Sequence, residues 1–447
     1  MIYILVLGTR GDLLPALALA VALQRRGHRA HIVTHDDHLS LVRGHGIGCT
    51  GSGTHSSSGG GSASDQDRDA EKLAVFNAVK RDVLFVIATL FCVAEASAAA
   101  DRFNVKWAAF SPFVATDFGL ASMGEFWDKV RESDLTGTVH SAIVADPEWK
   151  AAVEHWLWRL FLHDVGQFRE AVGLPSWPQF DYTARPPFLL YAIPASLAEL
   201  AALPLDATFA RFCGQWTLPS SPVSNPRASI FAQHSSLTRF IEKQNEKSRK
   251  ILHVGFGSMD TLHPCLARDA GSVATIVDSI YTALLQTNLA AIWIVDASMQ
   301  GCALRDYLLA KTNTLADRIC VLPGPVDHAL LFSSGLIRGS VHHGGIGTLT
   351  EVLRSGMKQV IVPYMFDQEK WGLRLMQEGV SKCFADVDPE FITVAEWVGA
   401  FNWISGDADL DRIQDWKVKL AVRDSSDQAV DLAVLAVESL LMKTPKT

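Results

Sequence analysis

A glycine- and histidine-rich segment carries the residues best suited to chemistry. Residues 341–348 read Val-His-His-Gly-Gly-Ile-Gly-Thr, and they lie between an apolar strand-like run (336–341) and a helix-like run (348–355). A strand that enters a helix through glycines exposes several backbone N–H groups. Such groups can hold a diphosphate at the positive end of the helix dipole, and a histidine adds a side-chain donor.

A second polar segment follows after one further strand-like run. Residues 363–368 read Pro-Tyr-Met-Phe-Asp-Gln. The carboxylate of Asp367 supplies acceptors, and the amide of Gln368 supplies both donors and acceptors, which suit sugar hydroxyls. Groups that bind phosphate beside groups that bind hydroxyls are what a nucleotide-sugar site requires.

Alternating strand-like and helix-like runs predict the elements that position these residues. A strand over 2–7, a glycine turn over 8–12, a helix over 15–26 and a strand over 30–34 form a βαβ unit, which builds a parallel sheet. A second set of strand-like runs lies at 251–256, 290–295, 319–322, 336–341 and 359–363. Ligands bind at the carboxyl ends of such strands, where the glycine turns fall.

The motif at 342–348, together with Glu351 and the Asp367–Gln368 pair, resembles the donor-binding signature of family 1 glycosyltransferases, the UDP-glycosyltransferase superfamily. Its double histidine is most similar to the bacterial antibiotic and sterol or lipid branch, and the plant form of the signature is absent. The resemblance extends over nearly the whole chain. It implies an α/β fold of the GT-B type, with two Rossmann-like doubly wound domains facing across a cleft.

The resemblance also implies a division of the chain into domains. We expect an N-terminal acceptor-binding domain over 1–220, with a flexible Gly/Ser loop, natural or engineered, at 51–69. A linker region over 221–250 should precede a nucleotide-sugar-binding domain over 251–425. Residues 426–447 should form a helix that packs back toward the N-terminal domain.

Donor-binding roles are carried over from the family residue by residue. His342 matches the histidine that contacts the diphosphate, whereas His343 is either a second contact or a structural residue. Glu351 matches the glutamate that binds the ribose hydroxyls, and Asp367 and Gln368 match the pair that holds the sugar. The amide cradle of the family corresponds to Gly344, Gly345, Gly347 and Thr348.

Two further donor contacts rest on weaker similarity. Ser258 lies in a Gly-Ser turn that resembles the family's phosphate-contacting turn, although such turns are common. Val326 lies in the segment before the signature, where backbone groups of the family pair with the base. The choice between uracil and thymine stays open.

Asp12 is the candidate catalytic residue of the N-terminal half. Residues 8–15 read Gly-Thr-Arg-Gly-Asp-Leu-Leu-Pro, and this turn resembles the branch of the family that has Asp where others have His. A carboxylate there can take the proton of an acceptor hydroxyl as that oxygen attacks the anomeric carbon. The alternative is that Asp12 caps a helix, because Asp is a favoured N-cap residue.

The acceptor pocket is expected in the aromatic N-terminal half. Phe113 and Asp117 are candidate contacts of the acceptor. Trp371 is expected to line the sugar pocket and to contribute to the acceptor pocket as well. The acceptor implied is an apolar hydroxylated small molecule, such as a polyphenol, polyketide, terpenoid, sterol or lipid.

Composition excludes several other classes. A net charge of −8 and a pI near 6.0 give no electrostatic basis for binding nucleic acid. Seven cysteines without a CxxC pair fit a reducing compartment, and we expect a cytoplasmic protein. The sequence contains no run of about 20 uncharged apolar residues, so it predicts no membrane-spanning helix. Peripheral membrane contact is compatible with the sequence.

No cofactor or metal is expected. The Asp-x-Asp runs at 386–388 and 407–409 are interpreted as solvated acidic loops. The histidines at 28, 31, 35 and 38 lack a coherent ligand pattern and are interpreted as surface or strand residues. The diphosphate charge would then be balanced by amides, His342 and the helix dipole.

The predicted function is an inverting, metal-independent glycosyltransferase that uses a nucleotide sugar, UDP-glucose or a dTDP-sugar, as co-substrate. Two alternatives are a nucleotide-sugar 2-epimerase of the same fold and a non-catalytic nucleotide-sugar-binding subunit. A dehydrogenase is disfavoured, because residues 8–12 do not form a G-x-G-x-x-G turn.

Overall fold

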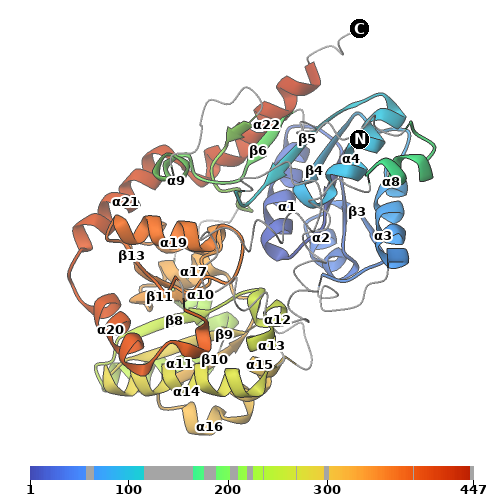
Figure 1. Ribbon diagram of the computed structural model, residues 1–447. Helices are drawn as coiled ribbons and strands as arrows, with labels where there is room; N and C mark the ends of the chain where they lie inside the picture. Colours follow the sequence, from blue (N-terminus) through green and yellow to red (C-terminus); the bar gives the residue numbers. More distant parts are fainter. Residues whose placement is uncertain are drawn as a thin grey trace. The chain divides into compact units, whose positions relative to one another are not determined.

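A computed structural model describes residues 1–56, 65–114, 165–175, 188–201, 210–218, 225–234, 236–267, 269–295, 302–385 and 387–442 (Figure 1). These residues form two compact units. The N-terminal unit contains the described residues up to 218 together with 423–442, and the C-terminal unit contains residues 225–422. Each unit has its own parallel sheet, which confirms the predicted pair of Rossmann-like domains.

The described sheet of the N-terminal unit has seven strands in the order β3-β2-β1-β4-β5-β6-β7, and every neighbouring pair is parallel. In chain order the strands are β1 (Ile2–Val6), β2 (Ala30–Thr34), β3 (Gly48–Gly51), β4 (Phe85–Thr89), β5 (Lys106–Ser111), β6 (Leu189–Tyr191) and β7 (Ala210–Phe212). The carboxyl ends of β1, β2 and β4 therefore lie together at one edge of the sheet.

Side chains of β1 alternate between two hydrophobic cores, because successive residues of a strand point to opposite faces. Ile2, Ile4 and Val6 pack with helices α1 (Arg10–Arg25) and α22 (Ser426–Met442) on one face. Tyr3 and Leu5 pack on the other face with α3 (Asp65–Ala78) and α4 (Val93–Phe103). The other helices among the described residues of this unit are η1 (Asp36–His38), α2 (Leu39–Gly44), η2 (Leu90–Cys92), α8 (Val165–Ala171) and α9 (Ala195–Leu200).

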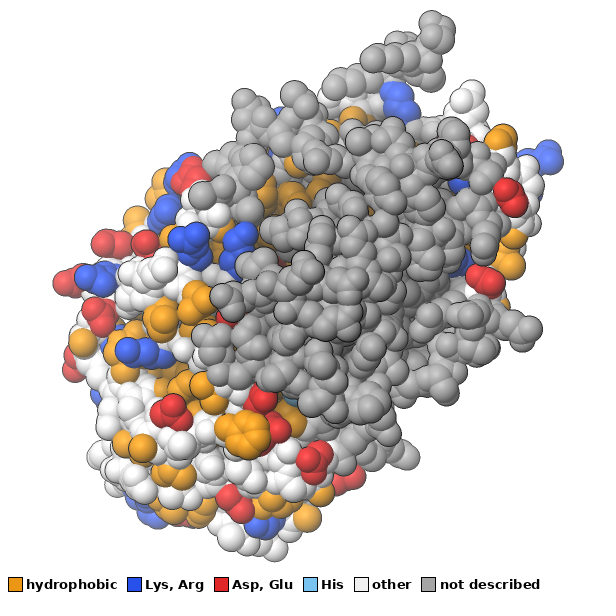
Figure 2. Space-filling model, viewed as in Figure 1, with side chains coloured by type: hydrophobic (Ala, Val, Ile, Leu, Met, Phe, Trp, Pro, Cys, Tyr) orange, Lys and Arg blue, Asp and Glu red, His pale blue; other side chains and the backbone are white. Residues whose placement is uncertain are grey.

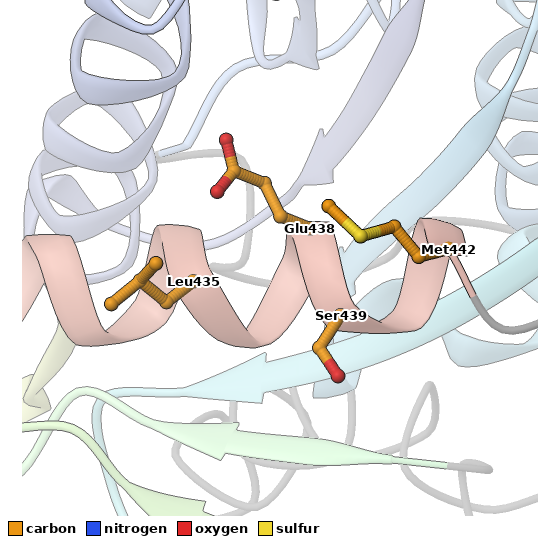
Figure 3. A pocket seen from close by; sticks show the side chains of 4 residues that line it. All are labelled: Leu435, Glu438, Ser439 and Met442. Carbon is orange, nitrogen blue, oxygen red and sulfur yellow. The ribbon is translucent and has the colours of Figure 1, made fainter.

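The C-terminal helix α22 belongs to the N-terminal unit. Its Glu438 forms ion pairs with Arg26 (2.7 Å) and His28 (2.9 Å) beyond the end of α1. Glu438 also lines a shallow surface pocket with Leu435, Ser439 and Met442 (Figure 3). This pocket contains none of the predicted site residues, so it is not the predicted site.

The described sheet of the C-terminal unit has six parallel strands in the order β10-β9-β8-β11-β12-β13. In chain order they are β8 (Ile251–Gly255), β9 (Ala290–Val295), β10 (Ile319–Pro323), β11 (Gly339–His342), β12 (Lys358–Ile361) and β13 (Ser381–Cys383). The helices are α10 (Pro226–Gln233), α11 (Ser236–Glu246), α12 (Met259–Leu262), α13 (Pro264–Ala267), α14 (Ala270–Gln286), α15 (Ala303–Ala310), α16 (Thr312–Leu315), α17 (His328–Ser333), α18 (Ile346–Arg354), α19 (Gln368–Gln377), η5 (Pro389–Phe391), α20 (Val394–Ser405) and α21 (Leu410–Arg423).

In two segments the structure differs from what the sequence predicted. The region 221–250, expected as a linker, contains α10 and α11, and Ile230, Leu237 and Ile241 of these helices are buried in the core of the C-terminal unit. The apolar residues recur at helical spacing among the charged ones, which allows one helix face to be buried. Of the loop expected at 51–69, Gly51 ends β3 and residues 65–69 begin α3, whereas 57–64 lie outside the described residues.

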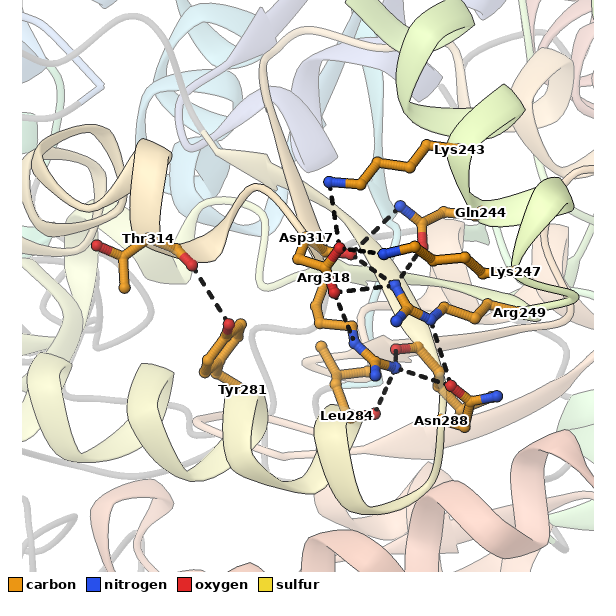
Figure 4. A network of polar contacts seen from close by, with 11 residues as sticks. Lys243, Gln244, Lys247, Arg249, Tyr281, Leu284, Asn288, Thr314, Asp317 and Arg318 are labelled. Carbon is orange, nitrogen blue, oxygen red and sulfur yellow. Dashed lines mark hydrogen bonds and ion pairs between the residues drawn. The ribbon is translucent and has the colours of Figure 1, made fainter.

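A polar network joins α11 to the amino ends of the strands in the C-terminal unit (Figure 4). Asp317, just before β10, accepts from Lys247 (2.8 Å) and Arg249 (3.0 Å), which follow α11. The Arg318 guanidinium donates to the carbonyl of Leu284 in α14 (3.3 Å). Because this network lies at the amino ends of the strands, it supports the fold and leaves the carboxyl ends to the predicted site.

The described surface is mixed in charge. Figure 2 shows acidic, basic and hydrophobic side chains interspersed over the described part of one face. Among the described residues, no helix combines the length and apolar character needed to cross a membrane.

Candidate functional site

In the N-terminal unit, the candidate site is the turn that follows β1 and the start of α1. Gly8 has φ +125°, which favours glycine, and α1 begins two residues later, at Arg10. The helix thus starts before the expected residue 15. The reason is a capping box, in which Thr9 is the N-cap and Asp12 is the third helical residue.

The alternative that Asp12 is the N-cap is wrong, because Thr9 is the N-cap and Asp12 is the third helical residue of the capping box, a position that still leaves Asp12 as the candidate base. Its Oδ2 accepts from the Thr9 backbone N–H (2.9 Å) and the Thr9 hydroxyl (3.4 Å), as a helix-capping residue does. Among the described residues, the donors to this carboxyl from elsewhere in the chain are the two groups of Thr9, and both bind Oδ2. Asp12 is 7% exposed, and burial raises the pKa of its carboxyl from 3.8 to about 7. A carboxyl with one oxygen held and a pKa near neutrality is suited to general-base catalysis.

In the C-terminal unit, the candidate donor site is formed by three loops at the carboxyl edge of the sheet. Strand β11 lies between β8 and β12, and His342 pairs with Gly255 on one side and Ile361 on the other. The loops that follow these strands contain Ser258, the histidine–glycine motif and Asp367. Parallel pairing therefore brings together the three donor segments that the sequence predicts separately.

The two histidines of the motif have different environments. His342 is fully buried, and its Nδ1 accepts from the Gly344 N–H (3.0 Å). Its Nε2 therefore carries the proton and donates to the Gln359 side-chain oxygen (2.8 Å). Both ring nitrogens of His342 are thus engaged within the unit. This differs from its expected role as the diphosphate contact.

His343 is half-buried, and its Nδ1 is buried without a hydrogen-bond partner among the described residues. Its ring lies close to two glycines: a Cβ added at Gly257 would be 3.0 Å from His343 Cε1, and one added at Gly345 would be 2.4 Å from Nε2. The ring therefore lies between the Gly-Ser turn after β8 and the start of α18. Burial lowers the pKa of His343 to about 3, so its imidazole is neutral at pH 7.

Gly344 allows the motif to fold against the sugar-binding segment. Its φ is +93°, and an added Cβ would lie 2.8 Å from Ile361 Cγ2 and 3.3 Å from Gln368 Cβ. Gly345 is the N-cap of α18. The first N–H groups of a helix lack intrahelical partners, so the amino end of α18 can bind an anion. Thr348 is half-buried and Gly347 exposed in that first turn.

Glu351 lies one turn further along α18. It is half-buried and 3.4 Å from Arg354, and burial raises the pKa of its carboxyl. Val326, expected near the base, is half-buried just after β10. Ser258 is half-buried at the start of α12.

Asp367 and Gln368 are held by hydrogen bonds at the start of α19. The Gln368 side-chain oxygen accepts from the N–H groups of Tyr364 (2.8 Å) and Met365 (3.1 Å). The Oδ2 of Asp367 accepts from the Trp371 indole N–H (2.7 Å). Trp371 is fully buried, so it does not wall a pocket as expected. Its position on α19, four residues after Asp367, turns it inward, where it orients that carboxylate.

Of the expected acceptor contacts, Phe113 lies just after β5 at the carboxyl edge of the N-terminal sheet. It is half-buried and its ring packs against Phe91 (centroids 5.7 Å apart). Asp117 lies outside the described residues.

Comparisons with known proteins agree with this architecture. Residues 2–57 match the family described as Glycosyltransferase family 28 N-terminal domain. The sterol 3-beta-glucosyltransferase of Pichia angusta is 25% identical over 86% of this chain and 30% of its own length. That of Aspergillus fumigatus is 25% identical over 97% of this chain and 29% of its own length. The chain thus spans less than a third of the length of these relatives.

Solved structures share the fold over almost the entire chain. The glycotransferase of kitacinnamycin superposes with a TM-score of 0.61 at 17% identity and covers 98% of both chains. The spinosyn rhamnosyltransferase SpnG in complex with spinosyn aglycone gives 0.59 at 14% identity, covering 98% of this chain and 99% of that one. The chain has the GT-B fold, and its sequence is similar to those of sterol 3-beta-glucosyltransferases.

Two histidines beside the turn that carries Asp12 were not assigned to the site from the sequence. His35 and His38 are buried, with exposures of 2% and 6%, although they were interpreted as surface or strand residues. Both contact Gly8. The signal that could identify them is position, because they directly follow β2, which is the sheet neighbour of β1.

Proposed function

We propose that this chain is an inverting glycosyltransferase that moves a sugar from a nucleoside diphosphate sugar to a hydroxyl of a lipophilic acceptor. UDP-glucose is the first donor to test, ahead of a dTDP-sugar. The observation that carries the proposal is Asp12, a buried carboxyl with Oδ2 held by Thr9 and Oδ1 available. The similarity to sterol 3-beta-glucosyltransferases supports a sterol as the first acceptor.

In the proposed reaction the acceptor hydroxyl transfers its proton to Oδ1 of Asp12 as its oxygen attacks the anomeric carbon. The bond from that carbon to the diphosphate oxygen breaks, and the electron pair leaves with the nucleoside diphosphate. A single in-line displacement converts an α-linked donor into a β-glycoside. The reaction requires Asp12 to reach the sugar when both substrates are bound.

The donor is assigned to the carboxyl edge of the C-terminal sheet. We assign the diphosphate to the amides from Gly345 to Thr348, the Ser258 turn and the ring of His343. His342 supports the loop by accepting from the N–H of Gly344, so that the amide of Gly344, expected in the cradle, is already engaged. Asp367 and Gln368 hold the sugar, Glu351 the ribose, and Val326 lies beside the base. We propose that backbone amides and the dipole of α18 offset the diphosphate charge without a metal ion.

The experiment that tests this function is a transfer assay with UDP-glucose and cholesterol in detergent micelles, with parallel polyphenol and macrolide acceptors. Mass spectrometry should detect a hexosyl product, NMR should show a β linkage, and excess EDTA should leave the rate unchanged. An α linkage or a strict metal requirement would contradict the mechanism. Release of UDP with formation of a free 2-epimerised sugar in the absence of acceptor would favour the epimerase alternative.

The two histidines should respond differently to replacement by alanine. His343→Ala removes a ring that faces the loops without an internal Nδ1 partner, so the Kd for UDP should rise about tenfold while the Tm changes little. His342→Ala removes two buried hydrogen bonds and should lower the free energy of unfolding by about 2–3 kcal/mol. Calorimetry with UDP and thermal unfolding measure both effects. If His342→Ala raised the Kd for UDP and His343→Ala lowered the stability instead, His342 would be the residue that contacts the diphosphate.

Transfer should depend on the ionisation of Asp12. Because only the unprotonated carboxylate accepts a proton, kcat/KM should rise with pH through a midpoint near 7, the raised pKa of Asp12. At pH 5.5 the rate should be about 30-fold below its plateau. The KM for UDP-glucose should stay nearly constant, since the pKa values of His342 and His343 are lowered to about 4 and 3. A midpoint near 4 would show that Asp12 is solvated in the working enzyme.

A further inference from the structure

The backbone turn that carries Asp12 is held by two buried histidines. The Gly8 N–H donates to His35 Nε2 (3.1 Å), and His38 Nε2 lies 3.3 Å from the Gly8 carbonyl oxygen. Both histidines come from the segment after β2, and η1 contains His38. Gly8 therefore has each of its backbone polar groups bound to an imidazole.

These contacts reach Asp12 through a single peptide plane. The peptide between Gly8 and Thr9 carries the Gly8 oxygen on one side and the Thr9 N–H on the other. His38 contacts the first, and Asp12 Oδ2 accepts from the second (2.9 Å). Rotation of this peptide would break both hydrogen bonds, so a group that holds the Gly8 oxygen also holds the carboxylate.

The approach of Gly8 to Asp12 is close. A Cβ added at Gly8 would lie 2.3 Å from Asp12 Oδ2, so the glycine backbone packs directly against the carboxylate. The φ of +125° is a conformation that only glycine adopts readily. Because glycine is also the most flexible residue, this conformation requires outside contacts to keep it, and His35 and His38 supply them.

The tautomers of the two histidines follow from their partners. His35 Nε2 accepts from Gly8, so its Nδ1 carries the proton and donates to the Thr54 hydroxyl (3.0 Å). Thr54 in turn donates to Glu71 (2.6 Å), which is 5% exposed. His38 Nε2 must carry a proton to donate to a carbonyl. The sequence of hydrogen bonds from Glu71 through Thr54 to His35 thus keeps His35 as an acceptor for Gly8.

We propose that His35 and His38 are positioning residues that hold the Gly8–Thr9 backbone, so that Asp12 directs its free oxygen toward the acceptor hydroxyl. This inference rests on the proposed function, since it assumes that Asp12 is the base. Neither histidine contacts substrate in this scheme. Their effect should therefore appear in turnover rather than in donor binding.

The test compares His35→Phe and His38→Phe with His35→Gln, in UDP-glucose transfer to cholesterol. The phenylalanine variants should lower kcat by about 10- to 100-fold, because a small misplacement of a catalytic group has effects of that size, and leave the KM for UDP-glucose within twofold. Gln places an acceptor oxygen near the position of Nε2, so His35→Gln should recover most of the turnover. His31→Phe is the matched control, since His31 lies in β2, just before this segment, and bonds Thr50 instead of Gly8.

Hydrogen exchange of the intact protein gives a readout independent of substrate. Amides of residues 8–12 should exchange faster in His35→Phe and His38→Phe and return toward the native rate in His35→Gln, with His31→Phe unchanged. Unaltered exchange and unaltered kcat in both phenylalanine variants would overturn the inference. So would a loss of stability that Gln fails to rescue, because that would indicate a general structural role.

The Asp12→Asn background separates this inference from the proposed function. If the histidines act through Asp12, adding His35→Phe to Asp12→Asn should cause no further loss of turnover. Full activity of Asp12→Asn alone would overturn the proposed function, whereas the exchange experiment would still test whether the histidines hold the turn. An inactive Asp12→Asn with a fully active His35→Phe would overturn only the positioning role.

Discussion

Replacement of Asp12 by asparagine should lower kcat for glucose transfer by about 10²–10⁴-fold, the range expected for loss of a general base. Asparagine has nearly the same shape and can still accept from Thr9, so the turn after β1 should keep its geometry. The amide oxygen, however, cannot take the acceptor proton. Measurement of initial rates with saturating UDP-glucose and cholesterol would give the decrease directly.

Stability and donor binding serve as controls for this variant. Burial raises the pKa of Asp12 from 3.8 to about 7, so the stability contributed by this group is fully present below pH 3.8 and is lost as the pH rises toward 7. At pH 8 the neutral asparagine should therefore unfold at a temperature no lower than the native protein. The Kd for UDP should change by no more than a few-fold. Turnover close to the native value would remove Asp12 as the base.

Replacement of Gly344 by alanine should raise the Kd for UDP by about 10- to 100-fold. The new Cβ would lie 2.8 Å from Ile361 Cγ2 and 3.3 Å from the backbone oxygen of Gln368, at a φ of +93°. Relief of this contact requires the loop between β11 and α18 to move away from the sugar-binding segment. Since the diphosphate is assigned to this loop, the binding free energy should fall by about 1.4–2.7 kcal/mol, which is about 10- to 100-fold in Kd. Calorimetric titration with UDP measures it.

Gly335 provides a matched control for this substitution. It lies in the same unit with φ +71°, but an added Cβ would meet nothing within 4 Å. Gly335→Ala should therefore lower the free energy of unfolding by about 1–2 kcal/mol through backbone strain alone and leave the Kd for UDP unchanged. Equal UDP affinities in the two variants would contradict the assignment of the diphosphate to the Gly344 loop.

Much of the fold could be predicted because parallel strands buried on both faces are short, continuous apolar runs. Residues 251–256 and 290–295 became β8 and β9 with nearly the expected bounds. Gly257, just after the first of these runs, marked the carboxyl end of β8. Boundaries were less predictable where a side chain sets them: α1 begins at Arg10 because Thr9 and Asp12 form a capping box, although Pro15 suggested a later start.

Assignments of individual side chains were less predictable, because spacing along the chain does not show which atoms a side chain contacts. His342 and His343 are adjacent, yet a hydrogen bond to Gln359, 17 residues away, makes the first a support for the loop. Trp371 could be recognised as aromatic and near the sugar-binding pair. Only its complete burial shows that it orients Asp367 instead of lining a pocket.

The sequence by itself determined the two parallel-sheet units and the residue types available for phosphate, hydroxyl and proton transfer, because local periodicity and glycine placement are properties of short segments. The tertiary structure alone decided which atoms of those residues are already engaged. Pairing of β1 with β2 brings His35 and His38 to Gly8, and pairing of β11 with β8 and β12 gathers the donor loops. Such contacts join residues distant in sequence, and they arise only when the strands align.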